Sequence, residues 1–156
     1  MSCDVALSAY LMLAAFHPAP ARPALVVPAV AAAANPLASE PLFAEIIGRA
    51  RKLNASVSTY LKAPQSAAPL PRFAAFKKDV SALSDMDLKG HLELAKRGTD
   101  GDLKCILNGI SQDLPKRLAD LETADDPSKR EAALKEMSYL LIDNVEVITA
   151  PPAPPV

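Results

Sequence analysis

The sequence predicts an all-α protein, an up-down four-helix bundle with a Pro-rich linker and a Pro-rich tail. Four segments carry apolar residues at the three- and four-residue spacing of amphipathic helices. Proline, glycine or helix-capping residues separate these segments, and no segment alternates apolar and polar residues long enough to indicate a strand. Helices with narrow apolar stripes bury them by packing stripe to stripe, which gives a bundle.

Length and charge limit the classes of function. The 156 residues suit one domain of ordinary size. Lys and Arg total 17 against 18 Asp and Glu, so the chain lacks the strong positive field that holds nucleic acid or an acidic membrane surface. We therefore expect no nucleic-acid partner.

Composition divides the chain into three parts. Residues 1–34 are rich in Ala and Pro, and the stretch Ala31 to Ala34 offers the small side chains that a signal peptidase accepts. We expect an export or thylakoid-transfer presequence cleaved near Ala34, with an Ala/Pro-rich disordered arm or a part of the fold as alternatives. Its apolar runs are too short to span a bilayer. Residues 35–150 form the predicted bundle, and 151–156 are a polyproline-like tail.

The first two predicted helices lie on either side of a proline-rich linker. The first begins after Ser39, as N-cap, and ends near Lys62. The second covers about residues 72–97, with a break near Ser84 because Ser84-Asp85-Met86-Asp87 resembles a capping box. After that break Leu88, Leu92 and Ala95 are expected to continue the apolar face, and Gly98 to end the helix.

The last two predicted helices have long apolar stripes. The third begins near Asp100 and runs to about Leu121, with a kink near Ser111 because Pro115 cannot donate a backbone hydrogen bond. The fourth begins at Asp126 as N-cap, with Pro127 at its first position. Glu131 and Lys135 are spaced to pair along its surface. Its predicted core positions are Leu134, Met137, Leu141, Val145 and Ile148.

The chain has few residues suited to catalysis or metal binding. His91 lies one turn beyond Asp87, a spacing that allows joint metal ligation or a proton relay, but we favour an exposed or interfacial histidine. Cys105 is expected to be a buried free thiol. No Cys-x-x-Cys-His, Glu-x-x-His or Gly-x-Ser-x-Gly motif occurs. We expect no enzyme activity, no metal, no cofactor and no small-molecule substrate.

Paired basic residues are the remaining candidate for a functional surface. Such pairs on helices are usually solvated faces, and docking on an acidic protein surface is the other interpretation. The pairs chosen as partner-binding residues are Lys77 with Lys78, Lys96 with Arg97, and Lys116 with Arg117.

The C-terminal half resembles a known family. Residues 114–124, 125–137 and 140–148 are similar to the last two helices of the PsbQ family, the extrinsic subunits on the lumenal side of photosystem II. In that family a Leu-rich helix leads through a Lys/Asp-rich connection into a final helix with an Ile-Asp-Asn-Leu-like turn, matched here by Ile142-Asp143-Asn144-Val145. The short Pro-rich extension before the first helix and the Pro-rich tail depart from the plant members and indicate an algal or otherwise divergent relative.

The resemblance implies a four-helix bundle with a non-catalytic accessory role. Such a protein would lie in the thylakoid lumen of a chloroplast, at the membrane periphery, and bind subunits of a photosynthetic complex. It would cover the water-oxidising centre and help retain its calcium and chloride. A bacterial periplasmic helical bundle that acts as an adaptor or small chaperone is the alternative, because it requires the same export signal and fold.

Overall fold

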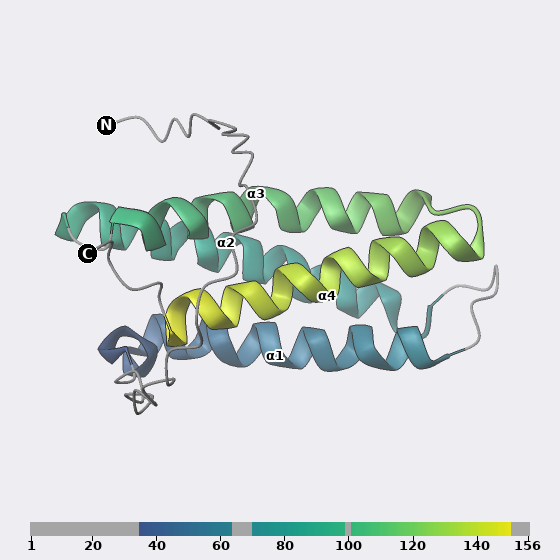
Figure 1. Cartoon of the computed structure of the whole chain (residues 1–156), viewed down its shortest axis with the longest axis horizontal. Helices are drawn as coiled ribbons and strands as arrows, with labels where there is room; N and C mark the ends of the chain where they lie inside the picture. The colour runs from purple at the N-terminus through teal and green to yellow at the C-terminus, as the bar shows by residue number, and fades with distance from the viewer. Residues whose placement is uncertain (1–34, 64–69, 99–100, 151–156) are drawn as a thin grey trace, which may run out of the picture. The chain divides into compact units, whose positions relative to one another are not determined.

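The computed structural model describes residues 35–63, 70–98 and 101–150, and it confirms an all-α fold (Figure 1). A short 3-10 helix, η1, covers Pro36–Ser39. The α-helices are α1 (Pro41–Lys62), α2 (Phe73–Arg97), α3 (Gly101–Thr123) and α4 (Pro127–Thr149). The described residues contain no strand. The predicted presequence 1–34, residues 64–69 of the predicted linker and the tail 151–156 lie outside this description.

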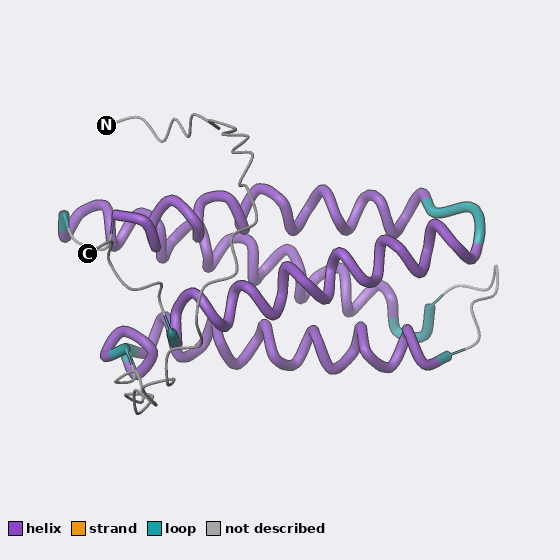
Figure 2. Tube along the Cα trace, in the orientation of Figure 1, coloured by secondary structure: helices purple, strands orange, loops and turns teal. Residues whose placement is uncertain are grey.

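The four helices form a ring in chain order, with successive helices antiparallel (Figures 1 and 2). Each of α1, α2 and α3 packs against the next helix, and α4 closes the ring against α1. The helices α2 and α4 therefore lie diagonally across the bundle. Among the described helices, none is long and apolar enough to cross a membrane.

The core is built from the apolar stripes of all four helices. Burial of a large aliphatic side chain contributes roughly 1.5–3 kcal/mol relative to exposure, so this shared interior is the main stabilising element. The largest fully buried side chains are Phe43, Ile46, Leu83, Leu94, Leu107, Leu114, Leu134, Met137, Leu141, Ile148, Val57 and Val80.

The helix ends follow the capping residues in most places. Asp126 caps α4 as predicted, with its carboxylate accepting from the Lys129 amide at 2.8 Å, and Pro127 is the first helical residue. Gly98 ends α2 in the left-handed conformation, with φ of 68°. Ser39 is not the N-cap of α1: it ends η1, and Glu40 precedes α1 without a capping side-chain bond.

Hydrogen bonds of Asn35 connect the start of the bundle to its end. Its side-chain oxygen accepts from the Leu37 amide at 3.2 Å and caps η1. Its side-chain nitrogen donates to the Ile148 carbonyl at 2.8 Å, and its backbone amide donates to the Thr149 carbonyl at 3.5 Å. Two carbonyls of the last turn of α4, which lack partners within their own helix, are thereby satisfied.

The predicted break in the second helix is wrong, because α2 is continuous through Ser84. The Ser84 hydroxyl donates instead to the Ser111 carbonyl on α3, at 2.7 Å. That carbonyl would accept from residue 115 in a regular helix, but Pro115 has no amide hydrogen. A neighbouring helix thus supplies the missing donor, and α3 continues through Pro115 to Thr123.

The continuous helix also changes the predicted register of α2. The buried positions continue from Val80 and Leu83 to Asp87, Gly90 and Leu94, at alternating three- and four-residue spacing. The prediction that Leu88, Leu92 and Ala95 face the core is therefore wrong, and all three are exposed. On α4, Val145 is only half-buried, and Asn144 beside it is fully buried.

Candidate functional site

The predicted basic residues do not form one surface. Lys77 and Lys78 lie in the first two turns of α2, whereas Lys96 and Arg97 lie in its last turn. At 1.5 Å per residue, these pairs are about 28 Å apart along the helix. Lys116 and Arg117 lie in the second half of α3.

Most of the predicted basic residues are paired within the bundle. Lys77 pairs with Glu122 of α3. Arg97 pairs with Glu40 at 2.9 Å and with Glu93 at 3.4 Å, and its hydrogen bond lowers the pKa of the Glu40 carboxyl. On α3, both of the predicted basic residues have partners in the same helix. Lys116 pairs with Asp113 at 2.8 Å, and Arg117 pairs with Asp120 at 3.0 Å. These cations are already balanced by neighbouring acids.

Lys78 and Lys96 are exposed and form no ion pair within the described residues. Lys96 lies one helical turn beyond Leu92, which lies one turn beyond Leu88. Leu88 is 43 % exposed and Leu92 is 51 % exposed. Together with exposed Lys89, they form a surface of two leucines and two lysines, which we call the α2 stripe: Leu88, Lys89, Leu92 and Lys96.

The α2 stripe was only partly predictable from sequence. Lys96 was recognised as a basic surface residue, but Leu88 and Leu92 were assigned to the core. The exposed Asp85 borders the stripe, one turn before Leu88, so the surface around the stripe carries both signs of charge. Two more exposed apolar side chains, Tyr139 and Ile142, lie on α4, diagonally across the bundle from α2.

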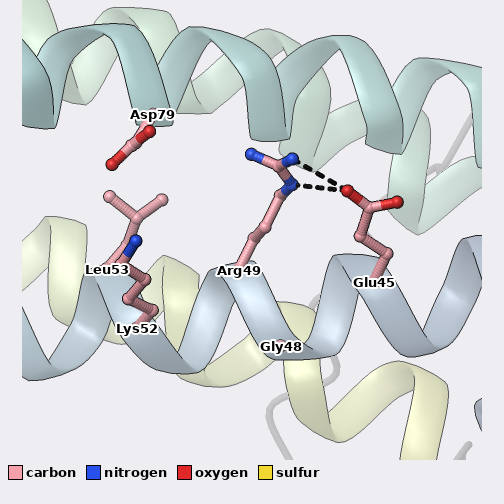
Figure 3. Close-up of a pocket in the computed structure, with 6 residues that line it drawn as sticks. All are labelled: Glu45, Gly48, Arg49, Lys52, Leu53 and Asp79. Carbon is pink, nitrogen blue, oxygen red and sulfur yellow. Dashed lines mark hydrogen bonds and ion pairs between the residues drawn. The ribbon is translucent and has the colours of Figure 1, made fainter.

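Two open grooves follow the boundary between α1 and α2. The first, of about 320 Å³, lies around Gly48 and contains the Glu45–Arg49 ion pair, whose atoms are 2.8 Å apart (Figure 3). Asp79 reaches into it from α2 above Leu53, as Figure 3 shows. The second groove, of about 270 Å³, continues from Lys52 past Tyr60 to Arg72. Both grooves are lined by acidic and basic side chains, so neither selects one ligand charge.

His91 and Cys105 have structural surroundings. The half-buried ring of His91 forms a hydrogen bond between Nδ1 and the Lys104 carbonyl on α3, at 2.7 Å, which agrees with an interfacial histidine. The prediction of a free thiol at Cys105 is wrong, because this cysteine is disulfide-bonded. The other cysteine of the chain, Cys3, lies outside the described residues. In the described ranges, no three His, Cys, Asp or Glu side chains are grouped to hold a metal ion.

Comparisons of this chain with protein-family models, with curated proteins and with solved structures gave no match.

Proposed function

We propose that this protein is a non-catalytic accessory subunit that docks on a larger protein complex through the α2 stripe. The observation that carries the proposal is the exposure of Leu88 and Leu92 beside Lys89 and Lys96, neither of which forms an ion pair within the described residues. Protein interfaces commonly combine an apolar centre with a charged rim. The lysines steer the bundle towards an acidic partner surface, and the leucines supply apolar area that becomes buried on contact.

The partner that we propose is the lumenal face of photosystem II. The support is the resemblance of residues 114–148, within α3 and α4, to the PsbQ family. The corresponding role is to cover the water-oxidising centre and help retain its calcium and chloride. In this proposal the protein is peripheral in the thylakoid lumen, and it requires no cofactor of its own.

The mixed chemistry of the α2 stripe predicts how attachment responds to salt. At about 1 M salt the Debye length falls to roughly 3 Å, so the attraction between exposed charges is largely screened. The apolar core of the bundle does not depend on these charges. We therefore expect concentrated salt to release the folded protein from photosynthetic membranes rather than denature it.

A rebinding experiment tests this proposal. Photosynthetic membranes are washed with concentrated salt, returned to low salt and mixed with the purified chain, and the bound fraction is measured by sedimentation. Replacing Lys89 and Lys96 by Gln, or Leu92 by Gln, should reduce rebinding at least severalfold. The matched control replaces Lys62 and Lys135 by Gln, which removes the same charge from exposed positions outside the stripe.

Two results would contradict this proposal. Equal rebinding by the stripe variants and the control would exclude the α2 stripe as the docking surface. A chain that does not bind photosynthetic membranes at low salt would not be a photosystem subunit, and the periplasmic adaptor or small chaperone would then be the better interpretation.

A further inference from the structure

Two polar side chains meet in the centre of the apolar core. Asp87 of α2 and Asn144 of α4 are both 0 % exposed. Although these helices are diagonal partners, the side chains reach across the bundle, and Asn144 Nδ2 donates to Asp87 Oδ2 at 2.9 Å. Buried carboxyl groups are normally paired with a base or with several donors, because burying an unpaired charge is costly.

The pair leaves two acceptor atoms unsatisfied. Neither Asp87 Oδ1 nor Asn144 Oδ1 has a hydrogen-bond partner. A carboxylate has no hydrogen to donate, so the ionised form of Asp87 cannot donate a hydrogen bond to Asn144 Oδ1. A carboxylic acid has one O–H donor, and a single proton placed on Asp87 Oδ1 would supply the missing bond to Asn144 Oδ1.

Among the residues that the structure describes, no charged side chain favours the ionised form of Asp87. One turn along α2, the space around Gly90 is filled by Leu107 of α3 and by Phe43 and Ile46 of α1. Of the charged residues of α1, Glu45, Arg49 and Lys52 line the outer groove instead, and Arg51 and Lys62 are exposed. On α3, Lys104 and Asp113 are half-buried, and Asp113 pairs with Lys116. On α4, the half-buried Asp143 and the exposed Glu146 lie close to Asn144 in sequence, and as acids neither would favour ionised Asp87.

The other polar groups near the interior are satisfied elsewhere. Ser111 of α3 donates to the Asn108 carbonyl at 2.7 Å, and His91 of α2 bonds to the Lys104 carbonyl. Burial raises the pKa of Asp87 to about 8, and the hydrogen bond from Asn144 opposes part of that rise. Asn144 is therefore the only side chain in the described residues that hydrogen-bonds to this carboxyl.

We propose that Asp87 is a neutral carboxylic acid in the folded protein and forms a cyclic acid–amide pair with Asn144, so that folding takes up one proton from solvent. Asp87 Oδ1–H donates to Asn144 Oδ1, while Asn144 Nδ2–H donates to Asp87 Oδ2. Both unsatisfied oxygens then have partners. The pair is a proton-dependent latch that joins the diagonal helices α2 and α4, and it does not depend on the proposed docking function.

The latch gives stability a defined dependence on pH. The folded state binds one more proton than the unfolded state at any pH between the ordinary Asp pKa and the raised one. Stability from this group is full below the ordinary value, falls as pH rises, and is lost as pH passes the raised value. The equilibrium constant for unfolding should therefore increase about tenfold per pH unit in this range.

Denaturant unfolding of the full chain tests the latch. Melts are recorded by circular dichroism from about pH 5 to pH 8, where the linkage acts. Asp87→Asn mimics the neutral acid, because its amide can donate to Asn144 Oδ1 and accept from Asn144 Nδ2 at every pH. The ratio of wild-type to Asp87→Asn unfolding constants should rise about tenfold per pH unit. Asp85→Asn, an exposed control on the same helix, should follow the wild type.

A second variant and a direct titration keep the test decisive if Asp87→Asn folds poorly. The double exchange Asp87→Asn with Asn144→Asp places the single acid on the opposite helix. It should recover the stability lost by Asn144→Asp alone, and it should return the steeper pH dependence of that two-carboxyl variant to about tenfold per pH unit. In the wild type, carboxyl carbon NMR should show Asp87 still protonated at neutral pH. Titration of Asp87 near the ordinary carboxyl range, or a wild-type to Asp87→Asn ratio independent of pH, would overturn the proposal.

Discussion

Ser84 shows how one hydroxyl on a neighbouring helix compensates for a proline. Pro115 removes the amide that the Ser111 carbonyl would accept from, and Ser84 donates to that carbonyl at 2.7 Å. A buried carbonyl left without a donor costs about 1–3 kcal/mol, so the bond stabilises α3 at its least regular position.

A double-mutant cycle should detect this compensation. Ser84→Ala is expected to reduce the free energy of unfolding by about 1–3 kcal/mol, because the Ser111 carbonyl loses its donor. In a Pro115→Ala background the cost should be smaller, since the new alanine amide can donate to the same carbonyl. The four proteins are compared by denaturant melts. An equal cost of Ser84→Ala in both backgrounds would show that the two residues act independently.

The helices differ in how well their sequences predicted them. The end of α1 and the start of α4 followed from local signals, because those signals act within a few residues, whereas the predicted N-cap of α1, Ser39, ends η1 instead. In α2 the local signals conflicted: Ser84 and Asp87 resemble a capping box, and Leu88 and Leu92 offer an apolar face at helical spacing. Packing resolved the conflict by keeping the helix continuous and burying Asp87.

The candidate site was less predictable than the fold, for a related physical reason. Whether a surface lysine or arginine is available depends on which helix lies beside it. Arg97 and Glu40 are 57 residues apart in sequence, and only the closed bundle brings them to 2.9 Å. The exposure of Leu88 and Leu92 likewise follows from the rotation of α2, which no local pattern specifies.

Two substitutions in and beside helix α4 compare the stability cost of losing a helix cap with that of losing a core side chain. Asp126→Ala should destabilise the protein by about 0.5–2 kcal/mol, because the Lys129 amide loses its capping acceptor. Leu141→Ala should cost more, about 2–5 kcal/mol, because it leaves a cavity at a fully buried position. Denaturant melts give both values. Asp125→Ala is the control, because its exposed pair with Lys129 contributes little. A larger loss for the control than for Asp126→Ala would contradict the capping assignment.

For the whole molecule, the pH of maximum stability is set by carboxyl groups whose pKa is lowered on folding and by one whose pKa is raised. Arg97 lowers the pKa of Glu40 and Lys129 lowers the pKa of Asp125, so both contribute stability at higher pH that is lost as pH falls through their lowered values. Asp87, with its pKa raised to about 8, loses its contribution as pH rises towards that value. The two effects together place the maximum on the acid side of neutrality.

Thermal melts over a range of pH measure this balance. The melting temperature should be highest near the ordinary carboxyl pKa values, and it should decline on both sides. Glu40 and Asp125 are exposed, so their side of the profile should be shallow and should weaken with added salt. A melting temperature that rises steadily up to pH 8 would contradict this account.

The contacts of Asn35 with Ile148 and Thr149 have a topological consequence. They bring the beginning of η1 against the last turn of α4, so the two ends of the bundle lie at the same corner of the ring. Because α4 already packs on α1, the packing of the ring does not depend on which pair of neighbouring helices is left without a connecting loop. A short covalent link at this corner, with the chain opened at another, would preserve every helix neighbour. The fold is in this sense cyclic, and its order of helices along the chain is one of several that the same packing permits.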